Sequence, residues 1–138
     1  MNKTIFAAVV LACITLGSCE NQEKKEVQTL FTSVMEVHDS VMPKMDDIHE
    51  ARKALKDQFT SADSTEVKAL LEKLGSADEA MMVWMEEFNS SYEAMPIQEQ
   101  KKYLESEMQR IQKVRDLMLE AIDESQKWIN SHEKPSAK

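Results

Sequence analysis

The stretch VKALLEKLGSADEAMMVWMEEF, residues 67–88, decides the fold of this chain. Its apolar residues recur at steps of three and four, and the series keeps one register on both sides of Gly75. This continuity predicts a single helix over residues 64–92. In the competing interpretation, one helix ends at Gly75 and another begins at a capping box formed by Ser76 and Glu79. The apolar positions are Val67, Leu70, Leu74, Ala77, Met81, Trp84 and Phe88.

Residues that break helices are scarce after residue 18. They are one glycine, Gly75, and three prolines, Pro43, Pro96 and Pro135. The sequence also lacks a run of alternating β-branched and polar residues, which would indicate a strand. A chain so poor in turn-forming residues is predicted to be all-α.

Two more amphipathic helices are expected beside the central one. The first covers residues 22–58 and contains Pro43, which lacks the N–H that would bond the carbonyl of Asp39, so we expect a kink there and not a full break. The last begins at Pro96, because the first position of a helix needs no N–H donor. Three long helices with short turns predict an up-down-up antiparallel three-helix bundle.

The N-terminus is typical of a bacterial signal peptide. Lys3 is followed by the uncharged residues 5–16, a run shorter than the roughly 20 apolar residues that span a membrane. The next residues, Leu16-Gly17-Ser18-Cys19, resemble the lipobox of bacterial lipoproteins. The resemblance implies removal of residues 1–18, a diacylglycerol on the Cys19 thiol, and acylation of the new amine, for example with palmitate. The alternative is a chance cysteine after an ordinary signal peptide.

These features predict a domain organisation and a location. The mature chain would begin with a lipidated tether over residues 19–25, continue as a helical bundle over 26–131, and end in a flexible tail over 132–138. Retention in the inner membrane is usually signalled by Asp after the lipidated cysteine. This chain has Glu20 instead, which favours a lipid-anchored protein of the cell envelope, on the periplasmic or outer side of the outer membrane.

Cysteine content and charge exclude several functional classes. Cys13 would leave with the signal peptide and Cys19 would be acylated, so the mature chain has no thiol for a disulfide or a thiolate metal ligand. The formal net charge of −8 becomes −9 when Lys3 is removed. Because no basic stripe stands out against this charge, nucleic acid is not an expected partner.

Methionine and histidine form an unusual pattern along the predicted helices. A fold-back near residue 61 places His38 opposite residue 84, so two groups of these side chains fall at one level. A second fold-back near residue 95 places residue 109 beside Met81 and brings Met108 to the same level. The candidate ligands are His38, Met42 and Met45 on the first helix and Met81, Met82 and Met85 on the second. His49 lies on the same face of the first helix.

Thioether and imidazole ligands without cysteine suit Cu(I), a soft ion, and Trp84 could present its ring face to such a cation. Haem with His and Met axial ligands is a second possibility, although the chain has no CxxCH attachment motif. The structural interpretation is that methionine fills gaps in a helical core and that His38 is a hydrogen-bonded residue at the core boundary. Without this ligand site, no cofactor is predicted.

The segments HDSVMPKMDDI, residues 38–48, and ADEAMMVWMEEF, residues 77–88, resemble a family of short helical lipoproteins of Gram-negative bacteria. KVRDLMLEAI, residues 113–122, is a weaker third block. Members of that family are mostly hypothetical proteins, and some carry the label "viral A-type inclusion protein", which reflects a coiled-coil-like composition. The resemblance supplies no activity and no functional residue.

The sequence contains no paired nucleophile and base, no phosphate-binding glycine loop and no convergent carboxylates. We therefore expect a non-catalytic interaction protein, held at a membrane by the lipid on Cys19. Its expected partner is another envelope protein or a second copy of this chain. The alternative function is binding of copper(I) or haem by the Met/His side chains.

Overall fold

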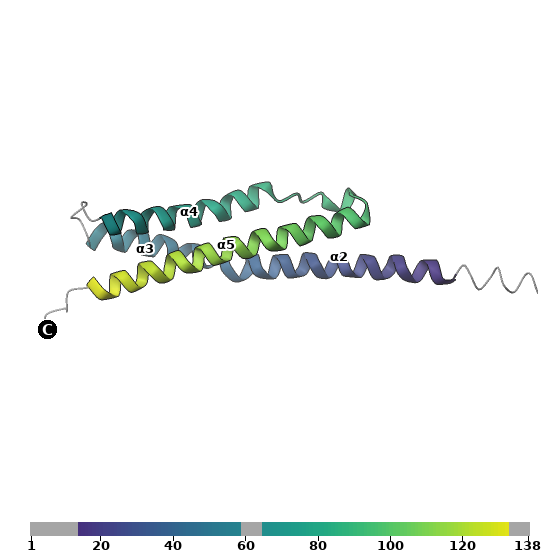
Figure 1. Ribbon diagram of the computed structural model, residues 1–138, viewed down its shortest axis with the longest axis horizontal. Coiled ribbons are helices and arrows are strands. Elements are labelled where there is room, and N and C mark those ends of the chain that lie inside the picture. Colours follow the sequence, from purple (N-terminus) through teal and green to yellow (C-terminus); the bar gives the residue numbers. More distant parts are fainter. Residues whose placement is uncertain (1–13, 59–64, 133–138) are drawn as a thin grey trace, which may run out of the picture.

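The computed structural model describes residues 14–58 and 65–132, and every regular element in this part of the chain is a helix. This confirms the predicted all-α fold (Figure 1). The elements are α2 (Ile14–Val41), α3 (Lys44–Gln58), α4 (Thr65–Glu87), the short 3-10 helix η1 (Tyr92–Ala94) and α5 (Ile97–His132).

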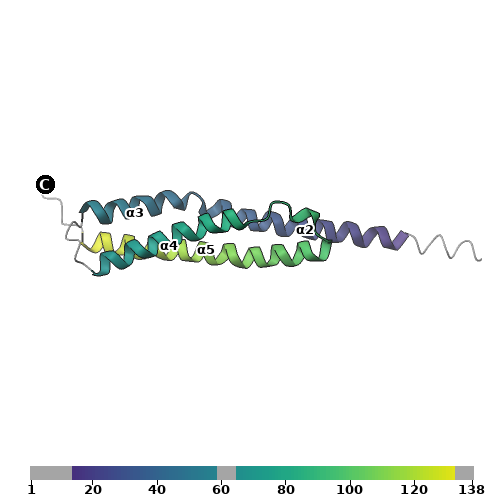
Figure 2. The same ribbon diagram turned by 90° about the horizontal axis from the view of Figure 1, so that it is seen from above.

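The helices form the expected up-down-up bundle. In Figures 1 and 2, α2 and α3 follow one another along one direction, α4 returns, and α5 runs back beside both. Polar contacts establish the direction of α5: Lys101 Nζ lies 2.6 Å from Glu26 Oε2, and Gln98 Nε2 donates to Glu23 Oε1 at 2.7 Å. Both pairs are separated by 75 residues, as two parallel helices in contact require.

The kink expected at Pro43 is present. Met42 and Pro43 separate α2 from α3, and the two helices together form one helical arm bent by 29°. Across the bend, Met42 N–H still donates to the carbonyl of His38 at 2.9 Å, so the chain keeps a helical path. The bend keeps Val41 and Ile48 buried on either side of it.

The ends of the helices differ from expectation. The first helix already includes Ile14, the first described residue, and so extends further toward the N-terminus than the expected start at residue 22. The central helix crosses Gly75 without interruption, as expected, but ends at Glu87 and not at residue 92. Asn89 explains this end, because its side-chain oxygen accepts a hydrogen bond from Ser91 N–H at 2.9 Å and so stabilises a turn in place of another helical turn.

The pairing expected between the second and third helices is wrong. Residue 109 was expected beside Met81, whereas Arg110 pairs with Glu87 at the end of α4. The segment between α4 and α5 runs alongside the first turns of α5 before the chain reverses. Asn89 N–H, for example, donates to the Tyr103 hydroxyl at 2.8 Å, and these extra residues shift the whole register.

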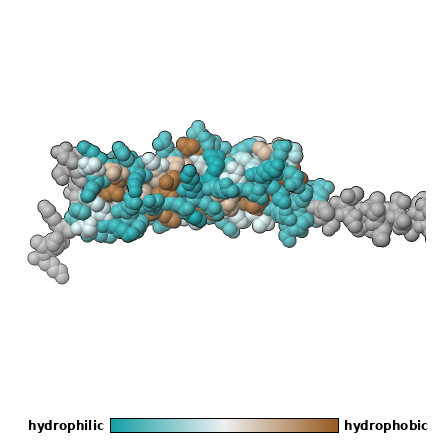
Figure 3. Space-filling view, in the orientation of Figure 1, coloured by the Kyte–Doolittle hydropathy of each residue, from teal (hydrophilic) through white to brown (hydrophobic). Residues whose placement is uncertain are grey.

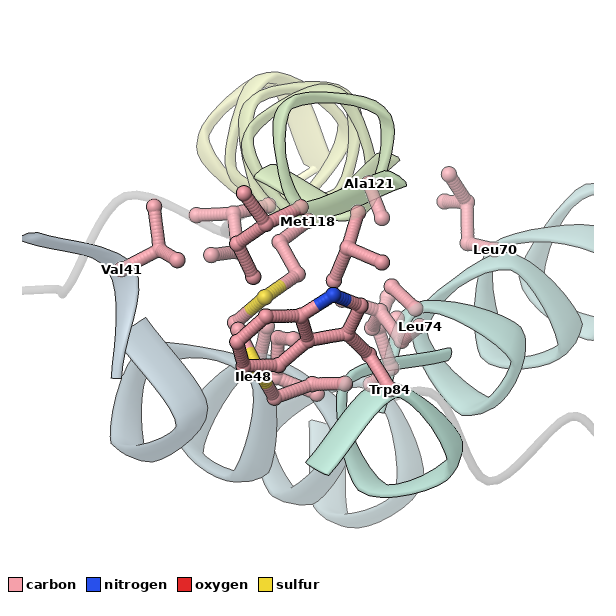
Figure 4. Close-up of a cluster of buried hydrophobic side chains, with 14 of the residues drawn as sticks. Val41, Ile48, Leu70, Leu74, Trp84, Met118 and Ala121 are labelled. Atoms are coloured by element: carbon pink, nitrogen blue, oxygen red, sulfur yellow. The ribbon is translucent and has the colours of Figure 1, made fainter. Parts of the chain in front are cut away.

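The core is built from the apolar stripes. Six of the seven apolar positions read from residues 67–88 are buried, and the seventh, Phe88, is half-buried. In Figure 4, the Trp84 indole from α4 and the Met118 side chain from α5 point toward one another. A second, smaller cluster at the other end of the bundle contains Val27, Tyr92 and Leu104.

Several expectations concern residues outside the described part of the chain. These are residues 1–13 of the expected signal peptide, the expected turn near residue 61, and residues 133–138 of the expected tail. Among the described residues, no helix is both long enough and apolar enough to cross a bilayer.

A carboxylate is buried in α5. Glu107 is 3% exposed, and its Oε1 accepts a hydrogen bond from Arg110 at 2.9 Å, while Oε2 has no partner among the described residues. Arg110 also contacts Glu87. Burial acts to lower the pKa of Arg110, but the bonds to Glu107 and Glu87 outweigh it and raise the pKa overall, so the guanidinium stays charged.

Replacing Arg110 by methionine is expected to lower the free energy of unfolding by about 1–3 kcal/mol, because a buried carboxylate would lose its hydrogen-bonding partner. Urea unfolding measures this loss. The control is Glu87→Gln, which removes only the exposed ion pair between Arg110 and Glu87. It is expected to lower the free energy of unfolding by less than about 1 kcal/mol. Equal stability of the Arg110 variant and the wild type would contradict a structural role for this pair.

Gly75 occupies an ordinary helical position, with no positive φ and no atom within 4 Å of an added Cβ. Gly75→Ala is therefore expected to raise the free energy of unfolding by about 1 kcal/mol, the difference in helix propensity between the two residues. The matched control is Ala69→Gly, at an exposed position of the same helix, which should lower stability by a similar amount. A loss of stability in Gly75→Ala would indicate a helix break at this position.

Candidate functional site

A cavity of about 360 Å³ lies between α2 and the end of α4. Phe31, Met35 and His38 line it from α2, where spacings of four and three residues place them on one face. Trp84 and Met85 line it from α4. Phe88, Ser90, Tyr92 and Glu93, which follow α4, complete the wall. The cavity therefore combines aromatic rings with two thioethers and one imidazole.

The rings of His38 and Trp84 contact each other in this cavity. Their ring centroids lie 5.5 Å apart with an angle of 31° between the planes. This contact confirms the expected pairing of residue 38 with residue 84. The Trp84 indole is 3% exposed, and its Nε1 has no hydrogen-bond partner among the described residues.

A second contact orients the His38 ring. Its Nδ1 lies 2.8 Å from Asp39 Oδ1, and the imidazole is 16% exposed. A carboxylate only accepts hydrogen bonds, so Nδ1 carries the proton in this contact. In neutral His38, Nε2 then carries no proton, and its lone pair is available to a ligand.

Aromatic rings form the rest of the wall. Phe31 stacks on Tyr92 with centroids 5.6 Å apart, and Trp84 contacts Phe88 at 5.2 Å. Burial raises the pKa of Tyr92, and the charge of Glu93 raises it further. The Tyr92 hydroxyl therefore stays neutral at physiological pH, and the wall is mostly uncharged.

The structure separates the methionines that the sequence grouped. His38 and Met85 line the cavity, and Met85 also packs half-buried against the main core. Met42 and Met45 pack half-buried against the same core but do not line the cavity. Met81 is fully buried, and Met82 points outward with 54% of its surface exposed. The candidate set therefore does not converge on one point.

His49 and Met108 lie elsewhere. His49 Nε2 is 3.5 Å from Asp78 Oδ1 and does not line the cavity. Met108 packs half-buried against the main core, two residues before the Arg110 that pairs with Glu87. The candidate lipidation residue, Cys19, lies within the backbone of α2, and its side chain is outside the described part of the structure.

Met35 was not among the residues predicted from the sequence. This residue lies three positions before His38 on the same face of α2 and lines the cavity. The same fold-back rule that paired residues 38 and 84 pairs residue 35 with residue 87, close to Met85. The signal was therefore present, but Met35 precedes the dense group of methionines around Pro43.

A second cavity, of about 410 Å³, lies between α4 and α5. Ala69 and Ala77 line it from α4, and Leu117 and Ala121 from α5. The ion pair of Lys73 with Glu124, at 2.5 Å, crosses between the same helices. Figure 3 shows a largely hydrophilic face with a few hydrophobic patches among the charged side chains.

The described residues contain no group of three or more His, Cys, Asp or Glu side chains that could hold a metal ion. No protein-family model, curated protein or solved structure matches the chain.

Proposed function

We propose that this protein is a non-catalytic lipoprotein of the bacterial cell envelope, anchored by a lipid on Cys19, and that its helical bundle binds another envelope component. The observation that carries the proposal is the lipobox-like Leu16-Gly17-Ser18-Cys19 directly after an uncharged segment. Two or more acyl chains anchor a protein stably, whereas one chain gives marginal binding. The outer membrane is the proposed location, because Glu20 and not Asp follows the cysteine.

The position of Cys19 relative to the bundle supports an anchor at one end. Cys19 is part of α2, and the first polar contacts of α2 with α5 are made by Glu23 and Glu26. A few residues would thus link the membrane to the bundle. The connection between α4 and α5 would then lie near the membrane, and the far ends of α3 and α5 would extend away from it (Figure 1).

The placement of charged side chains supports a non-catalytic role. Many form exposed ion pairs along one helix, such as Lys24 with Glu20 and Lys127 with Asp123. Pairs of this kind contribute about 0–1 kcal/mol each and keep a helix surface solvated. Such pairs are typical of a solvated helix surface.

The surface between α4 and α5 is the proposed contact surface for a partner. Leu117 remains 43% exposed beside the small side chains of Ala69, Ala77 and Ala121. Ala69 is exposed and small enough for another helix to approach closely, and the exposed leucine would gain from burial in the complex. The partner is another envelope protein, and a second copy of the chain is the other outcome of the test below.

The anchor is tested with Cys19→Ala. The variant is expected to lose the acyl mass and to leave the membrane fraction, because the thiol that would carry the diacylglycerol is gone. Cell fractionation and mass spectrometry measure both effects. The control is Cys13→Ala, which should change neither, since residue 13 would be removed with the signal peptide. An unchanged membrane fraction for Cys19→Ala would refute the anchor.

The contact surface is tested by placing a photo-crosslinking amino acid at position 117 or at position 119 in intact cells. Leu119 is a matched control, because it is 42% exposed and lies on the same helix but does not line the α4–α5 cavity. We expect a defined adduct from position 117 and none from position 119. The mass of the adduct distinguishes another protein from a second copy. Absence of an adduct at position 117 would contradict the proposal.

A further inference from the structure

We infer that Met35, His38 and Met85 form a binding site for a single Cu(I) ion beside the ring of Trp84. The three side chains line one cavity and come from two helices. This inference goes beyond the proposed anchoring and interaction, and it does not depend on the lipid.

The donor atoms match a soft cation. Two thioether sulfurs and one imidazole nitrogen suit Cu(I), whereas carboxylates and water suit Mg²⁺ and Ca²⁺. Glu93 supplies the only carboxylate lining this cavity in the described part of the chain. The site therefore offers three soft donors and a single carboxylate, which is little to bind a hard ion.

His38 is already oriented as a ligand. Metal-binding histidines usually donate the N–H of one ring nitrogen to a carboxylate or carbonyl, which holds the ring and makes the other nitrogen a better ligand. The contact between His38 Nδ1 and Asp39 Oδ1, at 2.8 Å, has this form. Its other nitrogen, Nε2, is free to bind the ion.

Trp84 adds a second attraction. A cation within about 6 Å of an indole face is stabilised by the ring quadrupole, and the effect is larger where water is excluded. The Trp84 ring contacts the His38 ring in a tilted arrangement, with centroids 5.5 Å apart, and Trp84 is almost fully buried. An ion bound to His38 would thus lie in the same cavity as the indole, together with the rings of Phe31 and Phe88.

Ordinary core packing makes a different prediction from metal binding. Methionine and leucine have similar volumes, so exchanging them costs less than about 1.5 kcal/mol where the side chain only fills space. The same exchange removes the sulfur that would bind Cu(I). Leucine variants therefore separate a ligand from a packing residue.

The experiment uses the full chain in detergent with Cys13→Ser and Cys19→Ser, so that no thiol competes for copper. Cu(I) is titrated anaerobically against a chromophoric Cu(I) chelator. We expect one ion bound per chain. The further variant Trp128→Phe leaves Trp84 as the only one of the two tryptophans, and its fluorescence should fall until one equivalent has been added.

Met35→Leu and Met85→Leu are each expected to weaken Cu(I) binding by about tenfold or more. The matched controls are Met42→Leu and Met82→Leu, whose side chains do not line the cavity, and both should bind as the parent does. Circular dichroism checks that all four variants keep the same helix content. His38→Phe keeps a ring against Trp84 but removes the nitrogen, and it should also weaken binding.

Three results would overturn the inference. The first is no binding of Cu(I) in competition with the chelator. The second is equal affinity of the Met35 and Met85 variants and the controls, which would assign these residues to packing. The third is a Soret band on adding haemin together with no binding of Cu(I), which would assign the cavity to haem.

Discussion

The structure depends on the burial of one apolar stripe along α4. Leu74 and Met81 on this stripe are fully buried between the arm formed by α2 and α3 on one side and α5 on the other. Burying a side chain of this size contributes about 1.5–3 kcal/mol, and buried positions recur along α4 from Val67 to Trp84. An interruption at Gly75 would divide the stripe. Because α4 is continuous, it can stay in contact along its length with the arm formed by α2 and α3 and with α5.

The cavity at His38 follows from where that stripe ends. Trp84 is the last buried residue of α4, and the helix stops at Glu87 because Asn89 stabilises a turn. The chain then places Phe88 and Tyr92 beside α2, without the regular packing of a continuing helix. A helix end next to a histidine and two methionines therefore produces a pocket between α2 and the end of α4.

Part of this site was readable from the sequence. The pairing of His38 with Trp84 follows from the lengths of the helices and the position of the turn near residue 61. The same reasoning places Met85, the next residue, close to His38. The other residues that line the cavity could not be predicted from the sequence. Periodicity places Met81 and Met85 near the same side of α4, but it does not show which of them the neighbouring helices enclose. Met81 points into the main core, Met85 into the cavity, and Met35 completes the set from a position outside the methionine-rich segment.

The sequence by itself determined the helices, the kink at Pro43 and the passage of α4 through Gly75. These features depend on hydrogen bonds and side-chain spacing within a few residues, so local chemistry is sufficient for them. Only the tertiary structure decided the pairing of α4 with α5, with Glu87 beside Arg110, and the grouping of Met35, His38 and Met85. Both depend on how far the segment between α4 and α5 runs before the chain reverses, and on contacts between residues far apart in the chain.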